Sequence, residues 1–290
     1  MRAGFLGPPG TNSHAALAAA AGRWEPVPLA TVAAVVRAVQ AGELPRGLVP
    51  IENSREGGIG ATLDALVFDA PDVAIVGELV HRVSYCLAAA EPVAPDEVRT
   101  VHSHPQATAQ CAGFLNDRMP GATIVAASST ADAVRAVAEG DILAGPPPHA
   151  AIGTLHAAEL YGGIVLAEGI EDDAENATRF AWIARREGGD PAHAPSDGPA
   201  APTKTALVFW GAGDRAPGWL VACLSEFASR EINLTRIESR PRRIGLGHYM
   251  FFCDFLGDPG DPAVADAVAG LRTHCEAVRV LGSFQSAIEY

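Results

Sequence analysis

The chain has 290 residues, of which 48% are hydrophobic and 19% charged, so it can build folded cores and is not typical of a disordered protein. Its 21 basic and 34 acidic residues give a net charge of −13, which argues against nucleic acid or an anionic membrane as a partner. The apolar runs are shorter than the roughly 18 residues of a membrane-spanning helix, and no apolar signal core follows Met1. We therefore expect a cytoplasmic protein.

The cysteines are odd in number and widely spaced, and no Cys-x-x-Cys pair or Cys/His cluster with zinc spacing occurs. The chain also has no P-loop, no dinucleotide-binding fingerprint and no Gly-x-Ser-x-Gly elbow. We expect free, buried thiols in a reducing compartment, no metal and no bound cofactor. The cysteines are Cys86, Cys111, Cys223, Cys253 and Cys275.

A shift in composition divides the chain. Residues 186–203 contain four prolines and three glycines but no large apolar side chain, so they cannot contribute to a core. We expect three parts: a first domain at residues 1–185, a linker at 186–203 and a second domain at 204–290.

Strand and helix patterns alternate along the first domain, which predicts an α/β fold. Parallel strands with helices on both faces hold their ligand at the carboxyl ends of the strands. The number of units favours mostly parallel sheet arranged in two lobes with a cleft between them. In chain order we expect a strand at 3–6, helices at 13–21 and 31–40, a strand at 47–51, a helix at 61–68, strands at 73–76 and 99–101, a helix at 105–116, a strand at 123–126, helices at 131–139 and 157–161, and a strand at 179–184.

The second domain follows a different order. We expect a strand at 204–211, a helix at 218–229, strands at 232–239 and 248–255, a helix at 262–275 and a strand at 278–282. This βαββαβ order is the ferredoxin-like layout. A module of this size favours regulation or interaction over a second active site.

Two loops at the ends of the first strands carry candidate ligand-binding residues. Glycines at 7 and 10, with Thr11 before a helix, can bring backbone N–H groups and a helix N-terminus toward an anion. Glu52, Asn53 and Ser54 follow an apolar strand, where polar groups must find partners. Each loop taken alone also fits a capped turn.

Two further loops add amides and a cation. Ser103 precedes a helix on which Gln106 and Gln110 share one face, so both amides can point into one pocket. Arg179 enters an apolar strand, and a buried guanidinium needs an anionic partner from the protein or from a ligand. Together, these groups are suited to hydrogen-bonding a small, oxygen-rich anion, which a solute-binding protein would also require.

Five stretches occur in the order found in one known family. They are GFLGPPGTNS at 4–13, VPIENS at 49–54, SHPQ at 103–106, TRF at 178–180 and INLTRIESRP at 232–241. The chain resembles prephenate dehydratase of the monofunctional bacterial type with a C-terminal ACT regulatory domain. The resemblance implies a two-lobed, periplasmic-binding-protein-like catalytic domain that converts prephenate to phenylpyruvate, water and CO2 in L-phenylalanine biosynthesis. It also implies feedback regulation by phenylalanine, no cofactor, and a homodimer or homotetramer.

The resemblance also assigns roles to residues of the first domain. Thr178 would donate a proton to the departing hydroxyl, and Glu52 is the alternative acid if burial raises its pKa. Arg179 would pair with a substrate carboxylate or fix its loop, and Phe180 would border the ring or pack in the core. His104, before a proline at a helix start, has either a capping or a catalytic role. The other expected substrate contacts are Thr11, Asn53, Ser54, Ser103, Gln106 and Gln110.

In the second domain the resemblance implies a phenylalanine site. Trp219 stands in a run where the family has a Gly-Ala-Leu-Val-like sequence, and its bulk would narrow or reshape the pocket. Phenylalanine inhibition is expected, with its strength dependent on this departure. The expected effector-binding residues are Gly218, Trp219, Leu220, Val221, Asn233, Leu234, Glu238, Ser239, Arg240 and Pro241.

Two alternatives stay open at this point. The chain can be an arogenate dehydratase, whose substrate has an amino group in place of the ketone. It can also be a non-catalytic amino-acid sensor whose two lobes only bind a ligand, although a sensor has no need of the Thr178 and Glu52 motifs.

Overall fold

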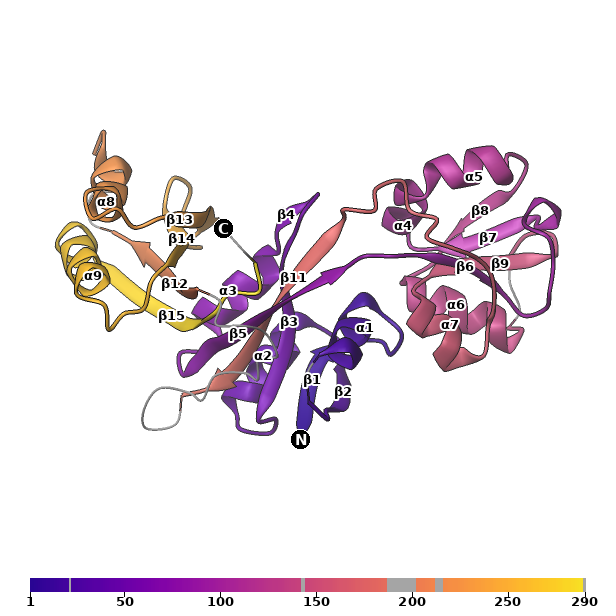
Figure 1. Ribbon diagram of the computed structural model, residues 1–290, viewed down its shortest axis with the longest axis horizontal. Coiled ribbons are helices and arrows are strands. Elements are labelled where there is room, and N and C mark those ends of the chain that lie inside the picture. Colours follow the sequence, from indigo (N-terminus) through magenta and orange to yellow (C-terminus); the bar gives the residue numbers. More distant parts are fainter. Residues whose placement is uncertain (21, 142–143, 187–201, 212–215, 289–290) are drawn as a thin grey trace.

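The computed structural model describes residues 1–20, 22–141, 144–186, 202–211 and 216–288. Figure 1 shows two lobes and a C-terminal unit in a row, with lobe 1 in the middle. Lobe 1 comprises the described residues of 1–82 and 177–186, lobe 2 those of 86–168, and the C-terminal unit those of 202–288. Most of the predicted linker lies outside the described residues. Within the described part of the chain, no helix is long and apolar enough to cross a membrane.

Lobe 1 is built on one mixed sheet. Its strand order is β2-β1-β3-β11-β5, and the short β4 pairs with β3. Helix α2 begins at the Thr31 cap and buries Val32, Val35, Val36 and Val39, which recur at helical spacing. The elements of lobe 1 are β1 (Arg2–Leu6), α1 (Asn12–Ala19), β2 (Glu25–Leu29), α2 (Val32–Gln40), β3 (Arg46–Asn53), β4 (Gly57–Gly58), α3 (Gly60–Phe68), β5 (Val73–Arg82) and β11 (Ala177–Arg185).

Lobe 2 is inserted between β5 and β11. The chain enters it through residues 83–85 and leaves it through residues 169–176, so two segments join the lobes (Figure 1). Its sheet has the order β10-β6-β9-β7-β8. Its elements are β6 (Cys86–Ala89), the 3-10 helix η1 (Pro95–Glu97), β7 (Thr100–Ser103), α4 (Pro105–Gln110), α5 (Ala112–Arg118), β8 (Thr123–Ala126), α6 (Thr130–Glu139), β9 (His149–Gly153), α7 (Leu155–Tyr161) and β10 (Ile164–Glu168).

The C-terminal unit has the predicted βαββαβ order and an antiparallel sheet, β13-β14-β12-β15. One face of this sheet packs on its two helices, through side chains such as Phe227 and Leu271. The other face shares a core with lobe 1, in which Phe252 and Phe284 join Leu66. The elements are β12 (Thr203–Trp210), α8 (Trp219–Ala228), β13 (Leu234–Pro241), β14 (Tyr249–Leu256), α9 (Pro262–His274) and β15 (Ala277–Gln285).

The two-lobed α/β layout is confirmed, but the sheets are mixed and not mostly parallel as predicted. Strand β11 runs antiparallel to both of its neighbours, β3 and β5, and β6 runs antiparallel to β9 and β10. The reason is that the chain passes between the lobes twice, so β11 returns into the middle of a sheet that was begun in the opposite direction. Strands β2, β4, β6, β9 and β10 were not predicted.

The helix predicted at 105–116 is interrupted. It is divided into α4 and α5 at Cys111, whose backbone leaves helical geometry at φ −118° and ψ 21°. Strands β3 and β5 are longer than predicted, and their additional residues include the polar Glu52, Asn53 and Glu78. All five cysteines are free.

Candidate active site

A cavity of about 320 Å³ lies where the two lobes meet. Lobe 1 contributes the start of α1 and the ends of β3 and β11 that face lobe 2, and lobe 2 contributes α4 and the start of α6. Among these lining residues none is Asp, Glu, Lys or Arg, so the wall consists of hydroxyls, amides, one imidazole, one phenol and apolar groups. They are Leu6, Gly7, Thr11, Asn12, Ser13, Asn53, Val83, Tyr85, His104, Gln106, Ala107, Gln110, Ser128, Ser129, Thr130, Asn176 and Thr178.

A chain of amide hydrogen bonds leads to Thr178. The Asn53 side-chain nitrogen donates to Thr178 Oγ1 at 3.1 Å and to Asn176 Oδ1 at 3.0 Å. Asn176 in turn donates to Gln110 Oε1 on lobe 2 at 3.0 Å. Because the Thr178 oxygen accepts from Asn53, its own hydrogen is directed to another acceptor. The predicted residues Thr178, Asn53 and Gln110 are therefore brought together, and Asn176 joins them.

Two helix N-termini meet the cavity, one from each lobe. Thr11 caps α1 by accepting from the His14 N–H at 3.4 Å, and Ser129 caps α6 by accepting from the Asp132 N–H at 3.0 Å. The positive end of a helix dipole and its free N–H groups favour an anion at this place. The cavity thus offers positive potential without a formal positive charge in its wall.

Asn12 and Tyr85 were missed by the sequence analysis. Asn12 Oδ1 is buried and has no hydrogen-bond partner within the described residues, while the Asn12 side chain bonds to Tyr85. Burial raises the pKa of Tyr85 to about 12, against the hydrogen bond from Asn12. The phenol therefore stays protonated and can donate. Asn12 stands in the quoted stretch at 4–13 but was not singled out there, whereas Tyr85 has no local signal, because it lies on the segment between the lobes, 73 positions after Asn12.

The other two polar side chains predicted on α4 are placed at the rim. His104 caps α4, its Nδ1 accepting from the Gln106 N–H at 3.3 Å, which is the structural role left open above. The Gln106 side chain donates to the Glu56 carboxylate across the cleft. Both line the cavity, with Gln106 turned toward lobe 1.

Four predicted substrate contacts are not among the lining residues, and they are Ser54, Ser103, Arg179 and Phe180. Ser103 is buried and donates to the Ile152 carbonyl at 2.7 Å, and Ser54 Oγ accepts from the Ala177 N–H at 3.0 Å. Phe180 lies in a core cluster with Phe5. The hydroxyls fix the backbone, and Phe180 has the packing role that was its alternative.

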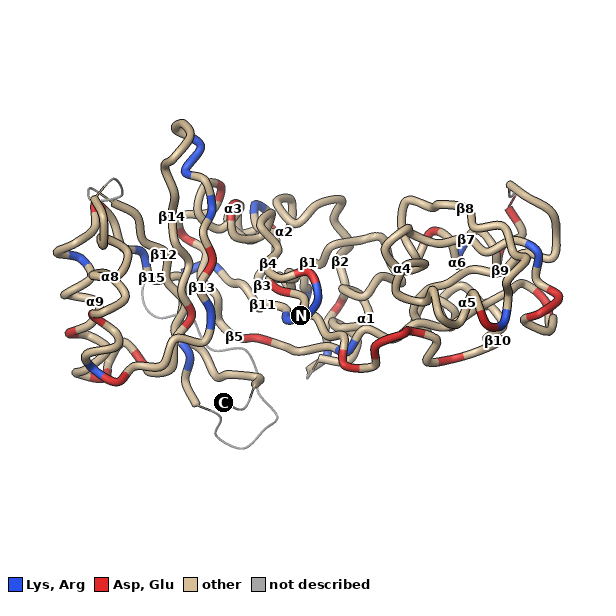
Figure 2. Tube along the Cα trace, turned by 90° about the horizontal axis from the view of Figure 1, so that it is seen from above, with Lys and Arg blue, Asp and Glu red and all other residues tan. Residues whose placement is uncertain are grey.

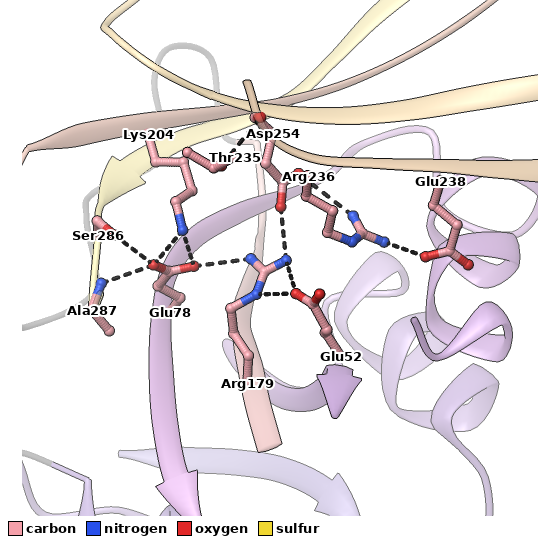
Figure 3. Close-up of polar contacts among 10 residues, drawn as sticks. All are labelled: Glu52, Glu78, Arg179, Lys204, Thr235, Arg236, Glu238, Asp254, Ser286 and Ala287. Atoms are coloured by element: carbon pink, nitrogen blue, oxygen red, sulfur yellow. Dashed lines mark hydrogen bonds and ion pairs between the residues drawn. The ribbon is translucent and has the colours of Figure 1, made fainter. Parts of the chain in front are cut away.

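Glu52 and Arg179 are placed together on the far side of the same strands. Arg179 Nε donates to Glu52 Oε2 at 3.0 Å, and neither residue lines the cavity. The guanidinium also contacts Glu78 and Asp254, as Figure 3 shows. The Arg179 side chain thus finds its anionic partners within the protein, which is one of the two alternatives left open, the other being a substrate carboxylate.

A second cavity, of about 180 Å³, lies in the C-terminal unit and includes the predicted 218–221 run. Trp219 is held there by a hydrogen bond from its indole N–H to the His274 carbonyl at 2.7 Å and by contact with the rings of Phe209 and Phe251. The indole lies in the wall of this cavity. The lining residues are Ala216, Gly218, Trp219, Leu220, Val221, Gly247, Tyr249 and Phe251.

The second predicted effector stretch does not line this cavity. Glu238 pairs with Arg236 at 2.7 Å, and Arg240 donates to Asp64 of lobe 1 at 2.9 Å. Leu234 packs at the edge of the C-terminal core. The remaining members are also outside the lining: Asn233 immediately precedes β13, Ser239 lies within it and Pro241 is its last residue.

The fold and the cavity define a class of protein: a two-lobed α/β protein with a βαββαβ unit and, between its lobes, a cavity whose uncharged donors suit a small, oxygen-rich anion. The chain belongs to the prephenate dehydratase family, whose model matches residues 3–188.

Relatives cover nearly the whole chain. A prephenate dehydratase of Mycolicibacterium vanbaalenii is 39% identical over 97% of this chain and 89% of its own length. The structure of Arthrobacter aurescens prephenate dehydratase in complex with L-Phe is 38% identical, with a TM-score of 0.85 and coverage of 99% and 90%. A structure described as a novel type of quorum-quenching acylase is 30% identical, with a TM-score of 0.84 and coverage of 99% and 98%.

Proposed function

We propose that this chain is a carbon–oxygen lyase that converts prephenate to phenylpyruvate, water and CO2 in L-phenylalanine biosynthesis. The observation that carries the proposal is the Thr178 hydroxyl, held by Asn53 in a cavity that offers uncharged donors to an anion. Prephenate carries two carboxylates, a ketone and a ring hydroxyl, so it is an oxygen-rich anion of the kind this wall suits. No cofactor is required, because the reaction forms an aromatic ring.

The proton balance supports a group such as Thr178 beside the leaving oxygen. The prephenate dianion yields the phenylpyruvate monoanion, neutral CO2 and hydroxide, so one proton is taken up from water in each turnover. The ring C–O bond breaks as the carboxylate leaves as CO2 and its bonding electrons enter the ring. Thr178 donates its hydrogen to the departing oxygen and recovers it from solvent, a role typical of general acids. Glu52 is the weaker candidate, because its carboxylate faces Arg179.

The uncharged wall favours prephenate over arogenate. The two substrates differ in one group, a ketone in prephenate and an ammonium in arogenate. A buried ammonium requires an anionic partner, and no carboxylate occurs among the described lining residues. A ketone needs only hydrogen-bond donors, which Tyr85 and the amides supply.

The acylase likeness is less well supported by the cavity. An acyl-transfer nucleophile needs an adjacent base. The one imidazole among the lining residues, His104, uses Nδ1 to cap α4. The Thr178 hydroxyl accepts from an amide and not from an imidazole.

We propose further that the C-terminal unit is an ACT regulatory domain at residues 204–290, joined by the linker to a catalytic domain at 1–185. Phenylalanine would bind at the cavity beside Trp219, in a homodimer or homotetramer within the cytoplasm. The relative solved with L-Phe supports this effector. Exposed apolar side chains gathered on the unit support a second copy as their cover; they are Val221, Ile237, Ile244, Leu246 and Tyr249.

The experiment is to follow phenylpyruvate by its ultraviolet absorbance in alkali, with prephenate as substrate, with and without L-phenylalanine. Turnover that L-phenylalanine suppresses supports both domains' assignments. Turnover that L-phenylalanine does not change supports the catalytic assignment and contradicts the assignment of L-phenylalanine as the effector. Turnover with arogenate alone reverses the substrate assignment, and inactivity with both substrates favours the sensor.

A further inference from the structure

Strands β3 and β11 place two adjacent residue pairs on opposite faces of one sheet. Thr178 is paired with Asn53, and Arg179 with Glu52. Since successive side chains of a strand point to opposite faces, the first pair faces the cavity and the second faces the C-terminal unit. A register shift follows immediately, between Arg179 and Phe180, and such irregularities in a ladder often aim side chains beside active sites.

Three carboxylates from three strands bind the Arg179 guanidinium (Figure 3). Nε donates to Glu52 of β3 at 3.0 Å, Nη1 to Glu78 of β5 at 3.0 Å, and Nη2 to Asp254 of β14 at 2.8 Å. The side chains of Arg179, Glu78 and Asp254 are 6%, 1% and 3% exposed. Asp254 belongs to the C-terminal unit, so this buried cation joins the two domains one residue after Thr178.

The partners are themselves held from the C-terminal unit. Lys204 and the Ala287 N–H each donate to Glu78 at 2.8 Å, and Ser286 donates to it at 3.0 Å. Arg236 lies 3.6 Å from Asp254. Burial by itself raises the pKa of Glu78, but Lys204 and Arg179 lower it below its ordinary range, so the carboxylate is ionised. In Figure 2, basic and acidic positions alternate along β13, which carries Arg236.

All three nitrogens of the guanidinium are engaged by protein, and the side chain lies on the sheet face away from the cavity. Burial by itself lowers the pKa of Arg179, but Asp254, Glu78 and Glu52 raise it above its ordinary value. Arg179 is therefore a fixed cation whose position depends on where β14 lies. Any displacement of β14 relative to β3 and β5 acts on β11 at this residue.

We propose that Arg179 is a positioning residue through which Asp254 of the C-terminal unit sets the place of the Thr178 hydroxyl. This inference rests on the proposed function of Thr178. The contact acts on kcat and leaves substrate affinity nearly unchanged, because Thr178, which donates to the leaving oxygen, is the one described lining residue that it moves. A misplacement of about 1 Å at a reacting group costs up to 10²-fold in rate.

The test uses two matched variants of the full chain, Asp254→Asn and Asp64→Asn. Both remove a carboxylate that pairs with arginine across the domain boundary, but Asp64 pairs with Arg240 and Arg243, away from β11. We expect Asp254→Asn to lower kcat about tenfold, leave KM within about twofold, and raise the L-phenylalanine concentration for half-inhibition. Asp64→Asn keeps kcat within about twofold.

Arg179→Lys serves as a second variant and retains the buried positive charge. We expect it to lower kcat with KM unchanged, because a lysine cannot bind three carboxylates in the guanidinium geometry. Thermal unfolding monitored by circular dichroism confirms that each variant is folded. A raised KM with kcat unchanged in Arg179→Lys would make Arg179 a substrate ligand and overturn the proposal. Equal kcat in Asp254→Asn and Asp64→Asn would also overturn it.

The positioning of β11 can also be tested if the proposed catalytic function is wrong. If the wild-type chain turns over neither prephenate nor arogenate, hydrogen exchange at the backbone of residues 177–181 is the readout. Faster exchange there in Asp254→Asn than in Asp64→Asn supports positioning of β11 by the C-terminal unit. Equal exchange in the two variants contradicts it.

Discussion

The two faces of the β3–β11 pair differ in charge: the polar side chains on one face are uncharged, and those on the other are ionised. On the cavity face, Asn53 and Thr178 are uncharged and hydrogen-bonded in a wall that contains no Asp, Glu, Lys or Arg among its described residues. On the other face, one residue away on each strand, Glu52 and Arg179 belong to a cluster of buried charges.

The difference follows from what each face must do. A fixed interface can hold charges permanently, because their partners are built into the chain and offset the cost of desolvation. A cavity that is alternately empty and filled with a dianion would leave a buried cation unpaired for part of each cycle. Amides, hydroxyls and helix N-termini attract the anion and bear no such cost when the site holds water.

The largest effect is expected at the hydroxyl itself. Thr178→Ala removes the donor from the cavity face and should lower kcat by about 10²-fold or more, the range of a general acid. Thr178→Ser keeps the hydroxyl and should retain most of the rate. Steady-state assays with prephenate measure both variants. A Thr178→Ala enzyme of nearly normal rate would remove this residue from the mechanism.

The second largest effect is expected on the free energy of unfolding, when a buried charge of the cluster around Arg179 is removed. Lys204→Met leaves Glu78 with one fewer cationic partner in a site where both side chains are 1% exposed. Loss of one partner of a buried ion pair costs about 3 kcal/mol of the free energy of unfolding, to be measured by urea denaturation. The double variant Lys204→Met/Glu78→Gln should lose less than the sum of the single variants. Strict additivity would show that the pair is not coupled.

A smaller effect tests whether the cavity must be uncharged. Asn12→Asp puts a carboxylate where Asn12 Oδ1 is buried in the wall, and repulsion of the dianion should raise KM about tenfold. Asn12→Ser is the matched neutral control and should change KM by less than about threefold. If both variants gave the same KM, the charge of the wall would be irrelevant to binding.

The smallest effect concerns the contact of the two lobes near the cavity. His14 Nδ1 lies 3.1 Å from His156 Nε2 of lobe 2, and burial, followed by the His156 charge, lowers the pKa of His14 below 6.5. Because the pKa of His14 is lower in the folded chain, the unfolded chain binds this proton at a higher pH than the folded chain does. The contribution of neutral His14 to folding stability is therefore complete above about pH 6.5 and is lost as the pH falls through the folded-state pKa. The midpoint temperature of thermal unfolding should therefore decrease when the pH is lowered from 7.5 to 5.5.

His14→Gln separates this pair from other buried histidines. The variant should lose roughly 2–4 °C less than the wild type over the same pH interval. His81 and His102, whose pKa values burial also lowers, remain in both proteins as a common background. An identical pH response would show that the lobe contact does not titrate.

Local patterns in the sequence were sufficient for most helices and for the βαββαβ order, because caps such as Thr31 and the spacing of apolar residues act over a few positions. Strands such as β2 were not predicted, since its two prolines and exposed edge position give it no apolar alternation. The antiparallel placement of β11 depends on the double passage between lobes, which no local pattern encodes.

The site was predictable where its residues share a motif and unpredictable where they come together only in the fold. Thr178 and Asn53 were named from motifs and Gln110 from its helical spacing to Gln106, and all three line the cavity. For Arg179 the choice between a protein carboxylate and a substrate carboxylate stayed open, because its sequence neighbours do not reveal that Asp254, 75 positions later, lies opposite. A strand places adjacent residues on opposite faces, so membership of one motif does not imply membership of one site.

The position of β11 also determines the order in which the two lobes can fold during translation. This strand lies between β3 and β5, yet it leaves the ribosome only after all of lobe 2 has been translated. At elongation rates of about 5–20 residues per second the first strands of lobe 1 therefore wait on the order of ten seconds for their central partner. During that interval two strand edges stand open to wrong pairing, while lobe 2, contiguous in sequence, can fold first. Lobe 1, although it begins the chain, is completed after its own insert.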